Sequence, residues 1–179
     1  MAEKNNKIYK LILSALFLAI GTVLPLFTAQ VKEIGDSLLP MHLAVMLCAF
    51  LCGPFYSGAV GFILPFFRSL IFGMPPLYPN AVYMSLELLC YALVIGFLYK
   101  KLENRGIAGV YASLVTAQIS GRIVWGISKV ILLGIGKNGF TFMAFITGGF
   151  VDALPGIALQ LVLIPFIVVL YQKINKNRV

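Results

Sequence analysis

Charged residues are scarce in this chain. Only 11% of its 179 residues are Asp, Glu, Lys or Arg, whereas 60% are hydrophobic, and the mean hydropathy is +0.97. An average soluble domain has about 25% charged residues, so this chain has too little polar surface to fold as one. We therefore expect an all-α integral membrane protein.

Residues that ligate metals or act as nucleophiles are also few. The chain has one histidine, His42, and three cysteines, Cys48, Cys52 and Cys90, all within apolar segments. Cys48 and Cys52 are one helical turn apart, but without a His cluster or a second Cys pair they are typical of packing residues. The Gly-x-x-x-x-Gly-Lys-Ser/Thr phosphate loop is absent. We expect no metal, no cofactor and no enzymatic activity.

Hydrophobic runs between charged or Pro/Gly-rich breaks predict six membrane-spanning helices, because a span needs about 20 apolar residues. They are expected within one domain, residues 1–179, at positions 9–27, 41–53, 57–72, 80–98, 107–133 and 140–170. The second and third are short and close together, so a bent hairpin or a partly re-entrant element is an alternative. The first run is longer than a secretion-signal core and lacks a small-x-small cleavage site, which favours an uncleaved span.

Basic residues are unevenly distributed between the two sides that these spans define. With a cytoplasmic N-terminus, the inner segments carry Lys4, Lys7, Lys10, Lys100, Lys101, Arg105, Lys173, Lys176 and Arg178. The outer loops carry only Lys32 and Lys137. This bias follows the positive-inside rule, so we expect both termini in the cytoplasm. The net charge of +8 then reflects topology and contact with anionic lipid, and it indicates no nucleic-acid partner.

Nearly all the charges inside the predicted spans fall in the outer half of the membrane. These residues are Arg68, Glu87, Arg122, Lys129 and Asp152, with His42 as a titratable neighbour. A charge in hydrocarbon costs about 3 kcal/mol even on lenient scales. Several at one depth, on five different helices, predict a shared polar pocket that is open to the outside.

Helical spacing places further candidates beside these charges. Gln118, Arg122, Trp125 and Lys129 form one stripe, and Asn80, Glu87 and Tyr91 form another. An indole, phenols and opposite charges on inward faces are typical of a site for a ring-bearing or amide-bearing polar metabolite.

The same charges have a purely structural alternative. Arg68 with Glu87, and Arg122 or Lys129 with Asp152, would form internal ion pairs that hold helices together. The common depth, the surplus of one positive charge and the nearby Trp125 favour ligand contact instead. The surplus predicts a ligand carboxylate or phosphate that binds Arg122 or Lys129.

These features together resemble one known family. Six short spans, cytoplasmic termini, an outward polar site and the pair Ala15-x-x-x-Ala19 in the first helix resemble the substrate-binding S component of energy-coupling factor (ECF) transporters, the vitamin-uptake family. The resemblance covers essentially the whole chain. Pro40-Met41-His42, Cys52-Gly53-Pro54 and Gly73-Met74-Pro75-Pro76 look like the branch that contains riboflavin and pantothenate binders.

The resemblance implies a mechanism. In that family the S component, a multi-pass protein of the bacterial plasma membrane, binds a vitamin from outside. It then docks on a membrane T component through its alanine-rich first helix and topples in the bilayer to release the cargo. Two separate ATPase subunits hydrolyse ATP. Ala15 and Ala19 match the docking motif.

Among vitamins, pantothenate ranks first, because it is a small anion with amide and hydroxyl groups. Its groups suit Arg122, Lys129, Asp152, Asn80 and Gln118. Riboflavin ranks second, since Trp125 and the tyrosines offer rings for flavin stacking. Folate-type and other anionic heterocycles are further alternatives.

Two other function classes fit less well. A stand-alone secondary transporter of a small anionic metabolite requires polar residues through the inner half of the spans, which is almost purely apolar. An intramembrane enzyme requires a metal or nucleophile constellation that His42 alone does not supply.

Overall fold

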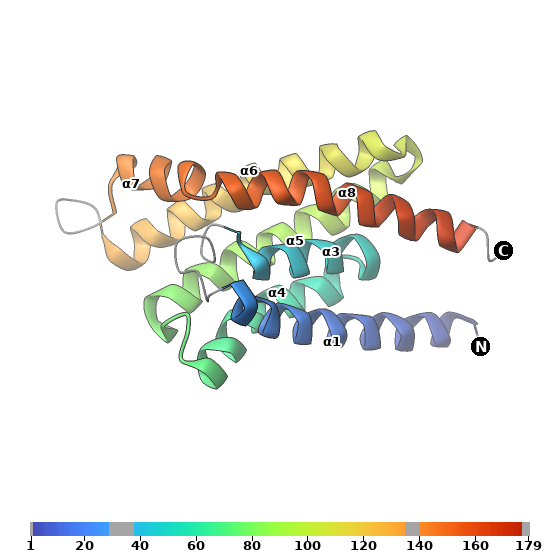
Figure 1. Cartoon of the computed structure of the whole chain (residues 1–179), viewed down its shortest axis with the longest axis horizontal. Helices are drawn as coiled ribbons and strands as arrows, with labels where there is room; N and C mark the ends of the chain where they lie inside the picture. The colour runs from blue at the N-terminus through green and yellow to red at the C-terminus, as the bar shows by residue number, and fades with distance from the viewer. Residues whose placement is uncertain (1, 29–37, 135–139, 177–179) are drawn as a thin grey trace.

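The computed structural model describes residues 2–28, 38–134 and 140–176, and every regular element among them is helical. The elements are α1 (Ala2–Thr28), α3 (Pro40–Cys52), α4 (Pro54–Phe72), η1 (Leu77–Ala81), α5 (Val82–Leu102), η2 (Glu103–Arg105), α6 (Ile107–Leu133), α7 (Phe142–Ile146), η3 (Thr147–Val151) and α8 (Leu154–Lys176). The long helices run roughly along one common axis (Figure 1). The expected all-α class is therefore confirmed.

Five described segments are long and apolar enough to cross a membrane. They are Lys7–Phe27, Pro54–Phe72, Leu77–Arg105, Ile107–Leu133 and Phe142–Ile174. Helix α3 has only 13 residues, which corresponds to about 20 Å of rise, whereas the hydrocarbon core is about 30 Å thick. The sequence predicted six spans, and the structure gives five candidates by length plus this shorter apolar helix.

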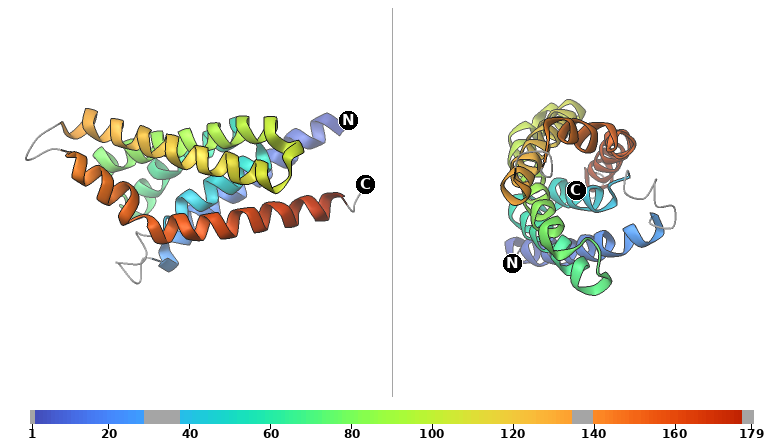
Figure 2. Two further views of the ribbon diagram at one scale, coloured as in Figure 1. Left: turned by 90° about the horizontal axis from the view of Figure 1, so that it is seen from above. Right: turned by 90° about the vertical axis from the view of Figure 1, so that its left-hand side faces the viewer.

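Helix α3 lies in the middle of the bundle. Pro40 begins it and Gly53 follows its last residue, and eleven of its thirteen residues are buried. Seen along the bundle axis, the other long helices are arranged around it (Figure 2, right), and it packs against α1, α4, α5 and α8. A helix that is apolar on every side needs neighbours on every side, so its composition explains its central position.

The two ends of the bundle differ. The beginning of α1 and the end of α8 lie at the same end, whereas the α4–α5 connection and α7 lie at the opposite end (Figures 1 and 2). A left-handed Gly73 ends α4, and Met74, Pro75 and Pro76 lead into η1. We call the end of the bundle with the α1 start and the α8 end the terminal end, and the end with the α4–α5 connection and α7 the loop end. Lys32 and Lys137, expected in outer loops, lie outside the described residues.

The last predicted helix, residues 140–170, is interrupted. The chain forms α7 and η3, turns at Asp152 and Ala153, and resumes as α8. The Asp152 N–H donates to the Thr147 carbonyl at 2.9 Å, a wider turn than that of an α-helix. Pro155 follows at the start of α8, where its missing N–H is tolerated. The interruption leaves Asp152 exposed at a helix junction, where it lines the cavity described below.

Candidate functional site

A cavity of about 580 Å³ opens at the loop end. Its walls come from the end of α1, the start of α3, the end of α4, the α4–α5 connection, α5, α6 and the η3–α8 junction. The polar and aromatic residues that line it are His42, Arg68, Phe72, Asn80, Tyr83, Glu87, Arg122, Trp125, Lys129 and Asp152. Eight of the ten predicted substrate-binding residues therefore surround one cavity, although they come from five separate parts of the chain.

Glu87 forms the centre of the cavity floor. Its Oε1 accepts from Arg122 Nη1 at 2.9 Å and from the Tyr91 hydroxyl at 2.9 Å. Its Oε2 lies 3.3 Å from His42 Nε2, which is within ion-pair range but lacks hydrogen-bond alignment. Glu87 is 1% exposed, His42 3% and Arg122 4%. A carboxylate at this depth is tolerated because these neighbours compensate its lost hydration.

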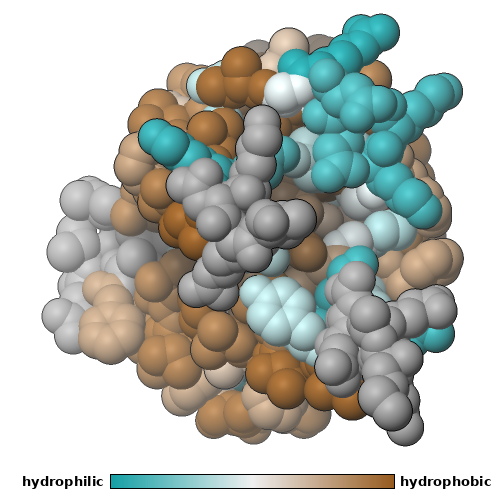
Figure 3. Space-filling view, turned by 90° about the vertical axis from the view of Figure 1, so that its right-hand side faces the viewer, coloured by the Kyte–Doolittle hydropathy of each residue, from teal (hydrophilic) through white to brown (hydrophobic). Residues whose placement is uncertain are grey.

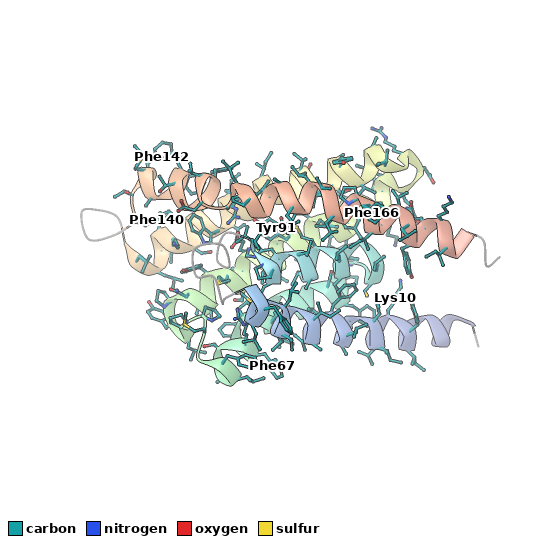
Figure 4. The ribbon with its side chains drawn as sticks, in the orientation of Figure 1. Lys10, Phe67, Tyr91, Phe140, Phe142 and Phe166 are labelled. Carbon is teal, nitrogen blue, oxygen red and sulfur yellow. The ribbon has the colours of Figure 1, made fainter. Side chains whose placement is uncertain are left out.

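Close helix contact holds this floor in place. The Tyr91 ring lies directly against Gly121 of α6, where an added Cβ would come within 2.4 Å of a ring carbon. The absence of a side chain at Gly121 lets α5 and α6 approach here. The approach brings Arg122, the next residue of α6, within reach of Glu87. Tyr91 occupies the centre of the bundle in Figure 4.

The pairing differs from the predicted one. The structural alternative paired Arg68 with Glu87, and Arg122 or Lys129 with Asp152, whereas among the described residues Glu87 pairs with Arg122. This alternative did not include the Glu87–Arg122 pair, because the depth of a residue along its helix does not show which faces of α5 and α6 meet. Arg68 is half-buried at the rim, with Nη1 3.9 Å from the Met41 sulfur.

Lys129 lies among aromatic rings. Its Nζ is 4.3 Å from the Trp125 ring centroid, 4.9 Å from that of Tyr83 and 5.3 Å from that of Phe140. Cation–π attraction to these rings holds the ammonium in place. Lys129 is half-buried and has no carboxylate within salt-bridge distance among the described residues. The aromatic rings therefore position its charge at the cavity.

Trp125 is packed from more than one side. Lys129 covers its ring, and Gly148 and Gly149 lie so close that a Cβ on either would be 3.3 or 3.4 Å from the indole. Only 7% of the residue is exposed. Phe140 meets it edge to face, with centroids 5.4 Å apart, at the loop end seen in Figure 4. Trp125 thus lines the cavity with little of its ring exposed.

Two predicted residues lie outside the cavity lining. Tyr91 is buried and donates a hydrogen bond from its hydroxyl to Glu87 Oε1. Gln118 donates to Gln160 Oε1 at 3.1 Å and joins α6 to α8 within the core. Gln160 was not among the predicted residues, although a lone amide in the apolar stretch 154–171 was a usable signal. Tyr83, one turn before Glu87 on the same helix face, was not among them either.

Ala15 and Ala19 lie away from this cavity. Both are exposed on α1, beside large apolar side chains that are also exposed, including Leu16 and Ile20. Their small side chains leave a shallow apolar surface on the outside of the bundle, where Ala19 lines a hollow with Ile20 and Val23.

Comparison with known proteins identifies the family. Residues 9–168 match the sequence model of the ECF transporter, substrate-specific component. The chain belongs to this family. No curated protein and no solved structure matches it significantly.

Membership gives the general role of the protein. An ECF S component is the substrate-binding subunit of a membrane transporter, and it works with a T component and ATPase subunits. Such components are transporter subunits and not enzymes. The five apolar segments agree with a multi-pass membrane protein.

Proposed function

We propose that this S component binds a water-soluble vitamin or related metabolite with an anionic group in the loop-end cavity. The observation that carries the proposal is the Lys129 ammonium, which aromatic rings position at the cavity without a carboxylate partner among the described residues. Arg122 is buried and its charge is compensated by Glu87. Of Arg122 and Lys129, the two cations that the sequence offered, Lys129 is therefore the one that binds the anionic group of the ligand.

Other groups at the cavity suit a ligand that both donates and accepts hydrogen bonds. Asp152 and Asn80 line the cavity, and the structure gives their side chains no hydrogen-bond partner among the described residues. The same holds for His42 Nδ1 and Arg122 Nε, which are buried. Buried polar atoms are normally satisfied, so hydroxyl and amide groups of a ligand have partners here.

Pantothenate remains the first candidate and riboflavin the second. A volume of about 580 Å³ falls within the usual range for small-molecule sites, about 300–1,000 Å³. A small molecule with a carboxylate, an amide and hydroxyls matches Lys129, Asn80 and Asp152. The close packing of Trp125 between Lys129 and the Gly148–Gly149 backbone leaves little ring face for a flavin, which supports this order.

The membrane arrangement that we propose has six passes. Helix α3 with its flanking residues would complete the sixth, and the neighbouring positions of the α1 start and the α8 end support an even number. The basic residues of the terminal end support a cytoplasmic location for both termini. The cavity then faces outward, and α1 docks on the T component through Ala15 and Ala19 before the protein topples to release its cargo.

Ligand-induced thermal stabilisation tests this function. Purified protein in detergent is heated with each member of a panel of water-soluble vitamins and precursors, because tight binding to the folded state raises its apparent Tm. We expect one strong shift, from pantothenate, and we expect Lys129→Gln to reduce it. Lys173→Gln, on the far end of α8, is the charge-matched control and should retain the full shift.

Two results would contradict the proposal. A full shift in Lys129→Gln would show that the anion binds elsewhere. Energy-dependent uptake by this chain without a T component and ATPases, and without a thermal shift from any compound, would favour the stand-alone secondary transporter.

A further inference from the structure

A second cavity, of about 470 Å³, lies at the terminal end. We propose that it binds the phosphate headgroup of an anionic phospholipid. The cavity lies where the end of α3, the start of α4, the last turn of α5 and α1 meet. It shares no lining residue with the loop-end cavity, so this inference does not depend on the identity of the transported molecule.

Two lysines from different helices face this cavity. Lys10 comes from α1 and Lys100 from α5, while Glu103 is the acid in the lining. Among the described residues, neither lysine lies within salt-bridge distance of a carboxylate. Lys10 is only half-exposed, and its side chain projects from α1 toward the body of the bundle (Figure 4). The described lining therefore carries two lysines, of which Lys100 is exposed, and one acid, so its net charge is positive.

The first turn of α4 adds neutral donors to these cations. Gly53, Pro54, Phe55 and Tyr56 all line the cavity, and no side chain caps this turn. The Gly53 N–H already donates to the Ala49 carbonyl and Pro54 has no N–H, so the donors of this turn are the N–H groups of Phe55 and Tyr56. Such groups have no partner inside the helix and favour anions. Gly96 brings α5 against Pro54, since an added Cβ there would lie 2.5 Å from the proline ring. This contact places Lys100, one turn further on, beside the α4 start.

The mouth of the cavity is apolar, which favours a lipid over a soluble phosphate. Phe55 is 77% exposed and Phe97 54% exposed, and their rings meet edge to face with centroids 5.9 Å apart. Both also line the cavity. Figure 3 looks onto the terminal end and shows hydrophilic residues gathered on one side, next to hydrophobic surface. A phospholipid offers its phosphate to the lysines and an acyl chain to the phenylalanines.

Lipid binding to the full chain tests the inference. Native mass spectrometry in detergent counts bound phosphatidylglycerol and phosphatidylcholine, and thermal stability is measured with the same lipids and with inorganic phosphate. The test variant is Lys10→Gln/Lys100→Gln. The control is Lys7→Gln/Lys101→Gln, which removes the same charge from the same two helices at exposed positions outside the lining.

We expect phosphatidylglycerol to bind the wild type and the control better than phosphatidylcholine does. The test variant should lose about tenfold in affinity for phosphatidylglycerol while keeping its lipid-free Tm. Equal losses in both variants would overturn the inference in favour of diffuse attraction to anionic lipid. Equal binding of the two lipids would also overturn it, and so would full stabilisation by inorganic phosphate, which would indicate a soluble anion as the occupant.

Discussion

At the scale of single residues, the candidate site depends on which charges neutralise each other. Glu87 and Arg122 are 35 positions apart in the sequence, yet they form the buried ion pair of the cavity floor. Among the described residues, Lys129 then has no salt bridge, and its ammonium lies over aromatic rings. Glu87 and Arg122 therefore have a structural role in the cavity floor, and under the proposed function Lys129 is the cation that contacts the ligand.

Breaking this pair should destabilise the protein strongly. Glu87→Gln leaves the Arg122 charge buried without a counter-charge, and we expect a loss of about 3–5 kcal/mol in the free energy of unfolding. Arg122→Gln should cost a similar amount. The double variant should lose clearly less than the sum, because it leaves no uncompensated charge. Denaturant unfolding in mild detergent measures all three variants, and additive losses would argue against a direct pair.

At the scale of helices, polar contacts decide how α8 is attached to the bundle. Gln118 of α6 donates to Gln160 of α8, and Gln160 is 1% exposed. The rest of the α8 face toward α3 and α6 is apolar, as Ile164 and Val168 show. A single amide pair in an apolar interface fixes the register of two helices, because any slip leaves both amides unsatisfied.

Removing one amide should cost more than removing both. Gln160→Leu leaves the Gln118 amide without its partner, and we expect a loss of about 1–3 kcal/mol in the free energy of unfolding. Gln118→Leu/Gln160→Leu should be nearly neutral, since two apolar side chains of similar size replace a buried polar pair. Thermal unfolding of each variant with and without ligand gives the comparison. A double variant as unstable as the single one would show that the amides do more than satisfy each other.

At the scale of the whole molecule, the cavity and the α1 surface are separate. The cavity opens at the loop end, whereas Ala15 and Ala19 are exposed along the outside of α1. Ligand binding and docking on the T component should therefore respond to different substitutions. This separation suits a subunit that binds its cargo in one step and meets its partner in another.

Bulky residues on α1 should abolish docking without affecting binding. Ala15→Trp/Ala19→Trp should prevent co-purification with the T component and the ATPases, because tryptophan fills the space that close helix approach requires. Ligand-induced stabilisation should stay within error of the wild type. Ala112→Trp and Ala158→Trp, at exposed positions of α6 and α8, are controls that should still assemble. Normal assembly of the α1 variant would exclude this surface as the docking site.

The lysine-lined cavity of the terminal end is separate from the loop-end cavity. It gives the subunit a contact with lipid at the end opposite the cargo, so lipid composition and cargo can act on the protein independently.

Local sequence properties determined the class and the family. Scarcity of charge and long apolar runs predicted an all-α membrane protein, and the resemblance to ECF S components was confirmed by the family match over residues 9–168. The riboflavin and pantothenate branch stays a prediction. Composition and helical period carry this information because each depends on neighbouring residues alone.

Only the tertiary structure decided which polar residues meet. The sequence placed Gln118 and Tyr91 with the ligand-facing set, but the packing of α6 on α8 and of α5 on α6 directs them to Gln160 and Glu87. The structural alternative considered from the sequence placed Arg122 or Lys129 with Asp152, whereas Arg122 contacts Glu87. Depth in the membrane follows from position along a helix, whereas partner choice depends on the rotation of each helix against its neighbours. That rotation is set by contacts such as Tyr91 on Gly121, which join residues far apart in the chain.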